Sequence, residues 1–477
     1  MKRGITKSHR LMNGNQLFFL SFLLFIIPIN SCVQDVKHVN WYLTNSDKSV
    51  LLEKQVPLKP AKDLESTIAT IYADDSEMFQ SIDGFGFALT GGSAILINAM
   101  DPEARKALLN ELFARRENSI GISYLRISVG ASDLSDRVFS YDDLLEGASD
   151  PEMKKFSLEP DKKDLIPILK QILEINPNVK ILGSPWSPPA WMKTNWQTKG
   201  GSLKPEYYDA YALYFVKYIE GMKAEGIGVD AITVQNEPLY PGNNPSMYMS
   251  AEEQAAFIRE SLGPAFKQAG IDTKIIIYDH NPNRVDYPIE VLNDPEARKY
   301  IDGSAFHMYE GKVEAISEVK KAHPDKNLYF TEQWVGAPGD FANDLRWHVK
   351  TLIIGAVRNW CKNVIEWNLA ADPKQEPHTT GGCTECLGAL TIDKDSVTRN
   401  PAYYIIAHAS KFVTPGSVRI SSNIPENLPN VAFKTPEGKM VLIVLNDAET
   451  RQDLQICFHD KSTTVSLNSC SVATFIW

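Results

Sequence analysis

Two glutamates stand where apolar, strand-like runs end, and together they could catalyse a hydrolysis. Glu237 follows the run 230–236 (DAITVQN) and precedes Pro238, while Glu332 closes the run 327–332 (NLYFTE). Proline has no backbone N–H to donate to a neighbouring strand, so the chain leaves the sheet at Pro238 and Glu237 stays at its edge. Paired carboxyl groups supply the acid and the nucleophile or base of glycoside hydrolysis. Retention and inversion of the anomeric configuration both stay open from these residues alone.

Side chains that could bind a sugar follow other strand-like runs in the same way. The polar ones are, in chain order, Asp279, His280, Asn281, His307, Tyr309 and Asn368. Five tryptophans stand near the same strand ends, namely Trp186, Trp191, Trp196, Trp334 and Trp367. The C–H faces of pyranose rings pack on indole rings, while amide, imidazole and phenol groups make directional hydrogen bonds. This combination favours a carbohydrate-binding cleft.

Eight strand-like runs alternate with helical patterns between residues 82 and 369. The runs cover residues 82–89, 122–129, 178–184, 230–236, 274–280, 304–309, 327–332 and 363–369. Apolar residues at helical spacing predict helices over 102–113, 164–175, 207–223, 251–269 and 341–360. Such an alternation predicts an α/β fold, a (β/α)8 TIM barrel whose reactive groups lie at the carboxyl ends of its strands. A doubly wound open sheet is the alternative, but no GxGxxG or Walker loop follows the first strand.

The two ends of the chain differ in character from this barrel, which is predicted over residues 81–410. Residues 411–477 contain short β-like runs, such as 439–445 (KMVLIVL), and no helical pattern. Residues 40–80 contain further β-like runs. Together, the segments 40–80 and 411–477 are predicted to form one β-sandwich side domain built from both chain ends.

Residues 1–31 are predicted to be an export signal. Several basic residues precede the apolar segment 17–29 (LFFLSFLLFIIPI), which is short for a membrane-spanning helix but suits a signal peptide. Cys32 follows a small residue, Ser31, as the lipidated cysteine of a bacterial lipoprotein does. An ordinary signal peptide is the alternative. We therefore expect an exported outer-membrane lipoprotein, facing the periplasm or the cell surface, that contacts the membrane through its lipid anchor only.

Charge and cysteine content bear on the remaining partners. The 477 residues carry a net charge of −10 without a basic run, so no nucleic-acid partner is expected. No HxH pair or carboxylate cluster suggests a metal, and no cofactor is expected. Cys383 and Cys386 are interpreted as a loop disulfide or two free thiols, and Cys457 could join Cys470 across neighbouring strands, with Cys361 left over. The sequence indicates no oligomeric state.

Seven short segments match one known family in the order in which that family has them. They are GFGFALT (84–90), YLRISVGASDLS (124–135), GSPWSPPAWMKTN (183–195), TVQNEP (233–238), FTEQW (330–334), EWNLA (366–370) and HASKFVTPGSVRI (408–420). On these segments the sequence resembles the glucosylceramidase-like enzymes of glycoside hydrolase family 30. The resemblance implies a barrel with catalytic glutamates after strands four and seven, and a β-sandwich side domain.

The resemblance also implies roles for the matching residues. Glu237 would be the acid/base, with a pKa raised by the charge of Glu332, and Glu332 would be the nucleophile of a retaining double displacement. Asn236 would contact the sugar 2-hydroxyl, Tyr309 would orient Glu332, and Arg126 would keep Glu332 ionised. The other substrate contacts would be Trp186 and Trp367 as walls of the −1 subsite, with His307, Asp133, Asn368 and Trp334.

One departure from the family bears on the substrate. Gly91, in the stretch GFALTGGSA (86–94), stands where glucosylceramidases usually have the Asp of GGAMTDAAA. This departure disfavours ceramide-linked glucose and favours a bacterial polysaccharide-degrading enzyme such as a β-1,6-glucanase. We therefore expect a retaining β-glycosidase acting on a β-glucan or on glucosylceramide-like glucosides, by exo or endo cleavage. The alternatives are a non-catalytic surface glycan-binding lipoprotein, or a family-30 xylanase-like or fucosidase-like specificity.

Overall fold

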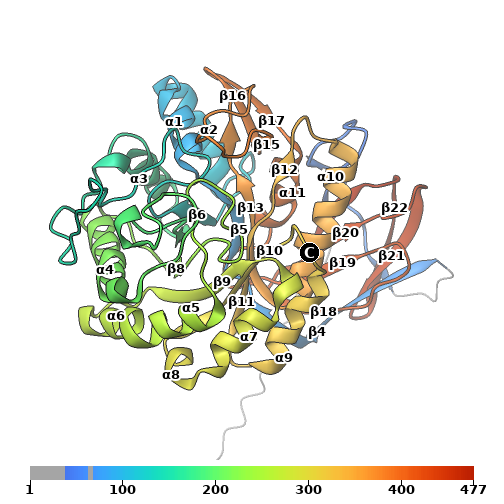
Figure 1. Ribbon diagram of the computed structural model, residues 1–477. Coiled ribbons are helices and arrows are strands. Elements are labelled where there is room, and N and C mark those ends of the chain that lie inside the picture. The colour runs from blue at the N-terminus through green and yellow to red at the C-terminus, as the bar shows by residue number, and fades with distance from the viewer. Residues whose placement is uncertain (1–37, 63–67) are drawn as a thin grey trace, which may run out of the picture. The chain divides into compact units, whose positions relative to one another are not determined.

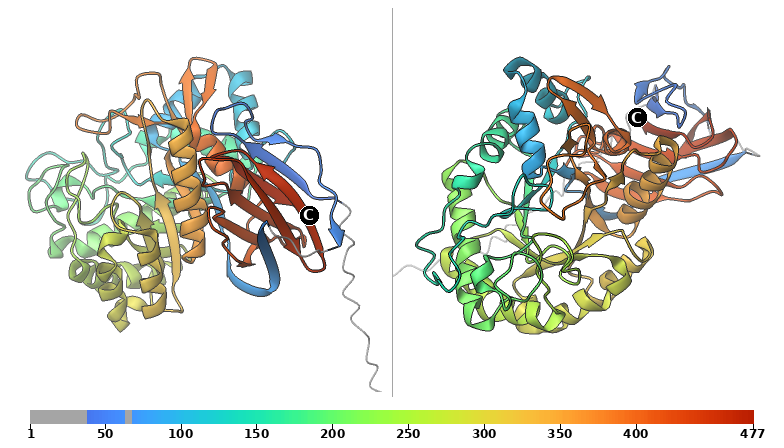
Figure 2. Two further views of the ribbon diagram at one scale, coloured as in Figure 1. Left: turned by 90° about the vertical axis from the view of Figure 1, so that its right-hand side faces the viewer. Right: turned by 45° about the horizontal axis from the view of Figure 1, so that its top comes forward.

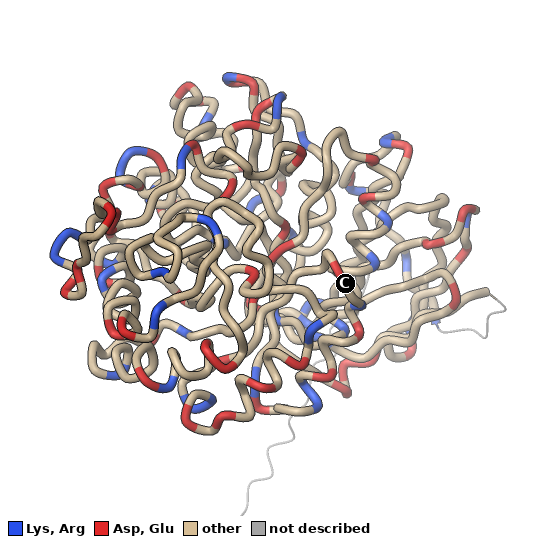
Figure 3. The backbone as a smooth tube through the Cα atoms, in the orientation of Figure 1, with Lys and Arg blue, Asp and Glu red and all other residues tan. Residues whose placement is uncertain are grey.

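A computed structural model of the chain describes residues 38–62 and 68–477 (Figure 1). The predicted signal segment 1–31 and Cys32 lie outside these residues, so they stay predictions. Among the helices of the described ranges, none has both the length and the apolar character needed to cross a membrane. Lysine and arginine are interspersed with aspartate and glutamate over the visible chain (Figure 3).

Eight parallel strands close into a barrel, which confirms the predicted fold class. Around the barrel the order is β10-β11-β13-β5-β6-β7-β8-β9, so each of the eight predicted runs supplies one strand. In chain order they are β5 (Gly84–Ala88), β6 (Tyr124–Ser128), β7 (Lys180–Ser184), β8 (Ala231–Thr233), β9 (Lys274–His280), β10 (Ile301–His307), β11 (Asn327–Glu332) and β13 (Cys361–Asn368). Strand β8 ends at Thr233, earlier than predicted, so Glu237 lies on the turn beyond the strand.

Helices surround the ring of strands (Figure 2). The predicted ones are α2 (Pro102–Phe113), α3 (Leu165–Ile175), α4 (Tyr208–Ala224), α5 (Ala251–Phe257) with η4 (Ile258–Leu262) and α6 (Gly263–Ala269), and α10 (Phe341–His348) with η7 (Val349–Ala356). Both η4 and η7 are π-helical turns. The sequence prediction lacks α1 (Gly91–Ala99), α7 (Asp286–Asn293), α8 (Pro295–Arg298), α9 (Ile316–Ala322) and α11 (Pro401–Ser410). Most of these are short, and α11 is buried along nearly its whole length, so it has no polar face to reveal a helical period.

Strands from both chain ends form the β-sandwich domain. In its ten-stranded sheet the order is β2-β1-β23-β20-β19-β18-β4-β21-β22-β3. The early strands are β1 (Asn40–Thr44), β2 (Glu53–Lys54), β3 (Ala61–Lys62) and β4 (Ala69–Ser81). The late strands are β18 (Val418–Ser422), β19 (Asn430–Lys434), β20 (Met440–Leu445), β21 (Gln452–Phe458), β22 (Lys461–Leu467) and β23 (Val472–Ile476). Strand β4 lies between β18 and β21, so the domain cannot be completed by the C-terminal segment alone.

Shorter strands lie within the loops at the carboxyl end of the barrel. They are β12 (Val335–Gly336), β14 (Ala370–Ala371), β15 (Cys386–Leu387), β16 (Leu390–Asp393) and β17 (Ser396–Arg399). A disulfide joins Cys383 to Cys386, the first residue of β15, so the structure has the first of the two interpretations left open, a loop disulfide and not two free thiols. The bridge considered between Cys457 and Cys470 is wrong, because Cys470 forms no disulfide. Its position explains this: Cys457 pairs with Ser462 near one end of the β21–β22 ladder, whereas Cys470 follows the other end, where Leu467 pairs with Gln452.

Helix α11 connects the barrel to the sandwich through a buried histidine. The Nδ1 atom of His408 lies 2.9 Å from the hydroxyl of Thr474 in β23, and Nε2 lies 2.8 Å from that of Thr44 in β1. The Thr474 hydroxyl donates to the carbonyl of His408, so Nδ1 carries the proton and Nε2 accepts from Thr44. Burial lowers the pKa of His408 to about 3, which keeps this imidazole neutral.

Candidate active site

Two irregularities turn polar side chains inward at the carboxyl ends of β9 and β11, the strands on either side of β10. In β9 the register with β10 passes from Tyr278 to His280, so Asp279 is an extra residue. In β11 the register with β10 passes from Phe330 to Glu332, so Thr331 is extra. Such a bulge re-aims one side chain and breaks the inward–outward alternation of a strand. Asp279 and Thr331 consequently meet, and the Thr331 hydroxyl donates to Asp279 Oδ1 over 2.6 Å.

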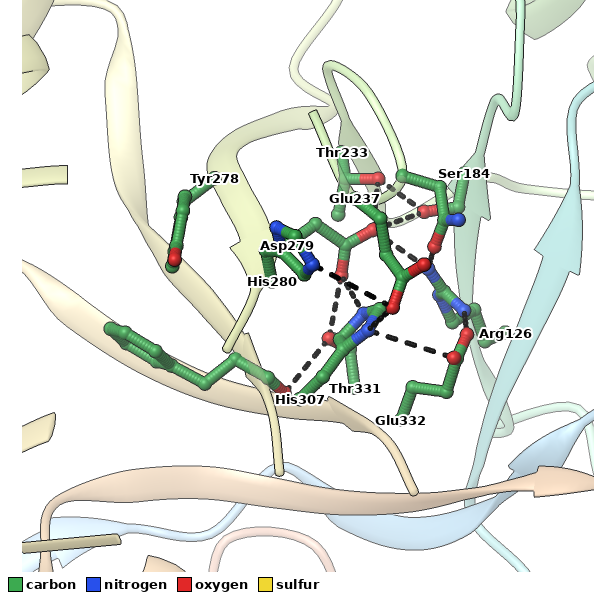
Figure 4. Close-up of polar contacts among 12 residues, drawn as sticks. Arg126, Ser184, Thr233, Glu237, Tyr278, Asp279, His280, His307, Thr331 and Glu332 are labelled. Atoms are coloured by element: carbon green, nitrogen blue, oxygen red, sulfur yellow. Dashed lines mark hydrogen bonds and ion pairs between the residues drawn. The ribbon is translucent and has the colours of Figure 1, made fainter. Parts of the chain in front are cut away.

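Asp279 is the centre of the polar network at this end of the barrel (Figure 4). The hydroxyls of Ser184 and Thr233 each donate to its Oδ2 over 2.8 Å. Arg126 donates to the same oxygen over 2.7 Å, and His307 Nε2 lies 3.1 Å from Oδ1. Burial opposes the charge of Asp279, but Arg126 and His307 outweigh it and hold the pKa of this carboxyl well below its usual range. The network therefore contains a permanent buried negative charge.

Arg126 on β6 connects this charge to the predicted nucleophile. Its Nη1 donates to Glu332 Oε2 over 2.5 Å, and its Nη2 also donates to the side-chain oxygen of Asn236 over 2.7 Å. The hydroxyl of Tyr309 donates to the other oxygen of Glu332 over 2.9 Å. Both oxygens of Glu332 are thus held in place, and the amide of Asn236 is oriented with its NH2 group away from Arg126. The predicted contacts of Arg126 and Tyr309 with Glu332 are present in the structure.

His307 lies between Asp279 and the two glutamates. Its Nδ1 is 3.2 Å from Glu237 Oε1 and 3.6 Å from Glu332 Oε1. Burial would lower the pKa of His307, but Glu332, Asp279 and Glu237 raise it to about 9. At neutral pH this imidazole is therefore a cation with both nitrogens donating. Its neighbour His280, with Nε2 at 3.9 Å from Glu237, has a pKa lowered to about 4 by burial and is neutral.

The pKa order of the two glutamates differs from the prediction. Burial raises the pKa of Glu332, although His307 and Arg126 favour its ionised form. Burial also opposes the charge of Glu237, but the hydrogen bond and charge of His307 lower the pKa of that carboxyl. The physical reason is the position of His307, whose cation lies closer to Glu237 than to Glu332. Because the three groups interact this closely, they titrate together and exchange protons among themselves.

The same three residues are close enough to be considered as metal ligands. One atom each of Glu237, His307 and Glu332 lies within 4.8 Å of the others. A histidine binds a metal through an unprotonated nitrogen, whereas both nitrogens of His307 face carboxylates and its pKa is raised to about 9. The arrangement fits an ion-pair network better than a metal site.

Aromatic side chains cover one side of this network. The indoles of Trp186 and Trp367 stack with their centroids 5.3 Å apart, and the Arg126 guanidinium lies 4.8 Å from the first and 5.7 Å from the second. Trp334 is partly buried and packs against the small apolar cluster that contains both indoles. Asp133 lies nearby, and its pKa is raised to about 7 by burial and by the charges of Glu332 and Glu237. These four predicted substrate contacts border the glutamate pair.

Asn368 and Gly91 both lie at the start of α1. The side-chain oxygen of Asn368 accepts from the hydroxyls of Thr90 and Ser93 over 3.1 and 2.9 Å. The NH2 group of Asn368 therefore points away from Thr90 and Ser93. Gly91 begins α1, and a Cβ there would stand 2.9 Å from the hydroxyl oxygen of Ser135. A larger residue at position 91 would therefore push on the loop that carries Asp133.

Sequence reasoning missed some functional residues and included a tryptophan that belongs elsewhere. Asp279 and His280 were visible only as the polar end of an apolar strand, and nothing in the sequence marked Asp279 as the network centre. Asn243, whose amide lies 3.4 Å from Glu237 Oε2, carries no local signal. Trp191 is a core residue, because its indole is buried and donates to the carbonyl of Asp142 over 3.1 Å.

Comparisons with known proteins agree on one family. Residues 82–413 match the model of the glycosyl hydrolase family 30 TIM-barrel domain, and residues 416–475 match the family 30 β-sandwich domain. An endo-1,6-β-D-glucanase of Aspergillus fumigatus is 35% identical over 77% of this chain and 78% of its own. The lysosomal acid glucosylceramidase of Mus musculus is 30% identical over 84% of this chain and 81% of its own. A solved endo-β-1,6-glucanase is 36% identical, with 92% of this chain and 99% of the other covered and a TM-score of 0.85.

Proposed function

This chain belongs to glycosyl hydrolase family 30, and from that premise we propose that it is a retaining β-glucanase that cleaves β-1,6-linked glucose polymers. Glu332 is the nucleophile and Glu237 the acid/base in this proposal. The observation that carries it is the pair of carboxyl groups held by Arg126, Tyr309 and His307 at the mouth of the barrel.

The distance between the two glutamates supports retention. One carboxylate oxygen of Glu237 lies within 4.8 Å of one of Glu332. Retaining glycosidases have carboxyl groups about 5 Å apart, whereas inverting ones leave about 6.5–9.5 Å for a water molecule between the base and the sugar. Glu332 would therefore attack the anomeric carbon directly.

The first chemical step forms a bond to Glu332. Its carboxylate oxygen attacks the anomeric carbon, the glycosidic C–O bond breaks, and the departing oxygen takes a proton from Glu237. In the second step Glu237 removes a proton from water, the water oxygen attacks the same carbon, and Glu332 is released. Arg126 and Tyr309 hold both oxygens of Glu332, which keeps one of them aimed at the sugar.

The proton for the first step is held by Glu237 and His307 together. With the pKa of His307 raised to about 9, this pair carries one proton at neutral pH. Its transfer over the 3.2 Å contact from Nδ1 to Glu237 leaves a neutral imidazole and a protonated acid. Binding of a sugar favours this transfer, because it removes water that stabilises the separate charges of Glu237 and His307.

Similarity to relatives supports β-1,6-glucan as the substrate. The fungal endo-1,6-β-D-glucanases are 33–36% identical to this chain, whereas the glucosylceramidases are 27–30% identical. Gly91, where glucosylceramidases usually have Asp, also favours a polysaccharide over ceramide-linked glucose. A glucosylceramide-like glucoside is the second candidate, since a lysosomal acid glucosylceramidase is 30% identical over 84% of the chain.

Product analysis on four substrates tests the proposal. The full chain is assayed on a β-1,6-glucan, a β-1,3-glucan, a xylan and glucosylceramide, with Glu332→Gln as the matched variant. We expect the wild type to cleave the β-1,6-glucan and to release the β-anomer first, as detected by NMR. In Glu332→Gln we expect kcat/KM to fall by at least about 10³-fold. An initial α-anomer would contradict retention. Full activity in Glu332→Gln would contradict the assigned nucleophile, and binding of the glucan without cleavage would indicate a glycan-binding protein.

A further inference from the structure

The side of Glu237 that faces away from Glu332 has its own polar neighbour. Glu237 Oε1 faces His307, whose Nδ1 atom is also close to Glu332. Glu237 Oε2 faces the side-chain amide of Asn243, whose Nδ2 lies 3.4 Å away. An acid/base donates its proton to the departing oxygen, so the departing sugar lies beside Glu237 and across from the nucleophile. Asn243 lies on the side of Glu237 where the departing sugar binds. Its contact with Oε2 is long for a hydrogen bond, so a sugar hydroxyl can replace Oε2 as the partner of this amide.

An exposed aromatic ring accompanies Asn243 in the same short segment. Tyr240 is 53% exposed, and its backbone N–H donates to the carbonyl of Glu237 over 2.9 Å. Its ring lies across Gly242, where a Cβ would stand 2.5 Å from the ring atom Cζ. The ring therefore lies against the backbone of Gly242, the residue before Asn243. An aromatic face next to a directional amide is the combination that pyranose rings need, since one packs on C–H groups and the other bonds a hydroxyl.

Loops on both sides hold this segment in place through Asn244. The Thr198 hydroxyl donates to the side-chain oxygen of Asn244 over 2.8 Å, and its NH2 group donates to the Thr380 carbonyl over 3.1 Å. The Thr379 hydroxyl donates to the backbone carbonyl of Asn244 over 2.6 Å. A segment fixed from two sides loses little conformational freedom when a ligand binds, which is typical of a built subsite.

A buried lysine adds a third attachment. Lys193 is fully buried, and its ammonium donates to the hydroxyl of Ser187 and to the carbonyls of Thr198 and Ser246 over 2.9, 3.0 and 2.7 Å. Each of its three protons therefore has an acceptor. Lys193 joins the loop after β7 to the segment that follows Glu237.

We propose that Tyr240 and Asn243 form the binding site for the departing sugar, the +1 subsite. The amide of Asn243 donates to a hydroxyl of that sugar, and the exposed face of Tyr240 packs against its C–H groups. This site selects a glycan over a lipid or a simple alcohol as the leaving group. The inference rests on the proposed role of Glu237 as acid/base.

Two donors that share the same glucosyl group and differ in the leaving group test the subsite. A short β-1,6-linked gluco-oligosaccharide places a sugar in the subsite, whereas β-glucosyl fluoride does not. We expect Asn243→Ala and Tyr240→Ala each to lower kcat/KM on the oligosaccharide by about tenfold, the size of a lost hydrogen bond or ring contact. On the fluoride, both should stay within about twofold of the wild type. Tyr72→Ala, which removes a 56% exposed tyrosine of the sandwich domain, is the matched control and should change neither value.

A second measurement separates sugar binding from any effect on Glu237. With β-glucosyl fluoride as donor and the oligosaccharide as acceptor, both variants should lower the ratio of transfer product to hydrolysis product. A variant that only disturbs Glu237 lowers both products equally, because the same base activates water and acceptor. An unchanged ratio, or equal losses of kcat/KM on the two donors, would overturn the inference. A wild type inactive on both donors would overturn the proposed function itself, and the inference with it.

Discussion

His307 donates through Nδ1 to Glu237 over 3.2 Å, and this contact places a buried cation beside the proposed acid/base. The cation persists because Asp279, on the opposite side of the imidazole, is itself ionised and hydrogen-bonded to three hydroxyls and Arg126. The pKa of His307 is consequently raised to about 9 despite its burial. Protonation of this one side chain should be visible in both the stability and the activity of the protein.

The raised pKa of His307 predicts a loss of stability at alkaline pH. The folded state binds its proton more tightly than the unfolded state, so this contribution is complete below pH 6.5 and is lost as the pH rises through about 9. Over that interval we expect the free energy of unfolding to fall by up to about 1.4 kcal/mol per pH unit. Urea denaturation at a series of pH values measures this change in the free energy of unfolding. His307→Gln, which cannot titrate, should show a shallower dependence, and an equal slope in both proteins would contradict the assignment.

Removal of the carboxyl group of Glu237 should affect substrates according to their leaving groups. Natural glycosides need a proton on the departing oxygen, whereas aryl glycosides with acidic phenols leave almost unassisted. We expect Glu237→Ala to lose about 10²–10⁴-fold in kcat/KM on the glucan and much less on such aryl glycosides. Glu290→Ala, which changes a glutamate of α7 outside the site, serves as the control for loss of charge. Equal losses on both substrates would count against an acid role.

His408 predicts a loss of stability at acid pH. Burial lowers its pKa to about 3, so the folded state binds fewer protons than the unfolded state between pH 3 and 6.5. Its contribution is present above pH 6.5 and should be lost by up to about 1.4 kcal/mol per unit as the pH falls. Denaturation of the wild type and of His408→Gln between pH 4 and 7 measures the difference in slope. An equal pH dependence of the free energy of unfolding in both proteins would contradict the lowered pKa of His408.

Cys32 and the segment before it predict that the protein is exported and carries a lipid anchor. Cys32 follows the apolar segment 17–29 and a small residue. We therefore expect the full chain, expressed in a bacterium, to enter the membrane fraction and to incorporate labelled fatty acid. Cys32→Ala should abolish the label while the folded domains keep their activity. A wild-type chain without label would favour an ordinary signal peptide.

The fold was largely predictable from periodicity, and so was part of the site. Each of the eight predicted runs is a barrel strand, because a strand buried on both faces must be apolar throughout and stands out in any sequence. The polar residues that end these runs meet at one edge because the carboxyl ends of parallel barrel strands lie on the same side. The sequence could not show where β8 ends, because the turn from Thr233 to Glu237 is hydrogen-bonded to neighbours far away in the chain, such as the Asp279 carbonyl.

The sequence by itself determined the barrel, the family and the identity of the two glutamates, since these depend on residue type and order along the chain. The tertiary structure alone decided which side chains share a proton. Asp279 and Thr331 point inward because bulges in β9 and β11 shift the alternation of those strands, and no local pattern encodes such a shift. The distance from His307 to Glu237 then follows from three strands packing together. Electrostatic energy depends on distances through space, so the pKa order of the site exists only in the folded chain.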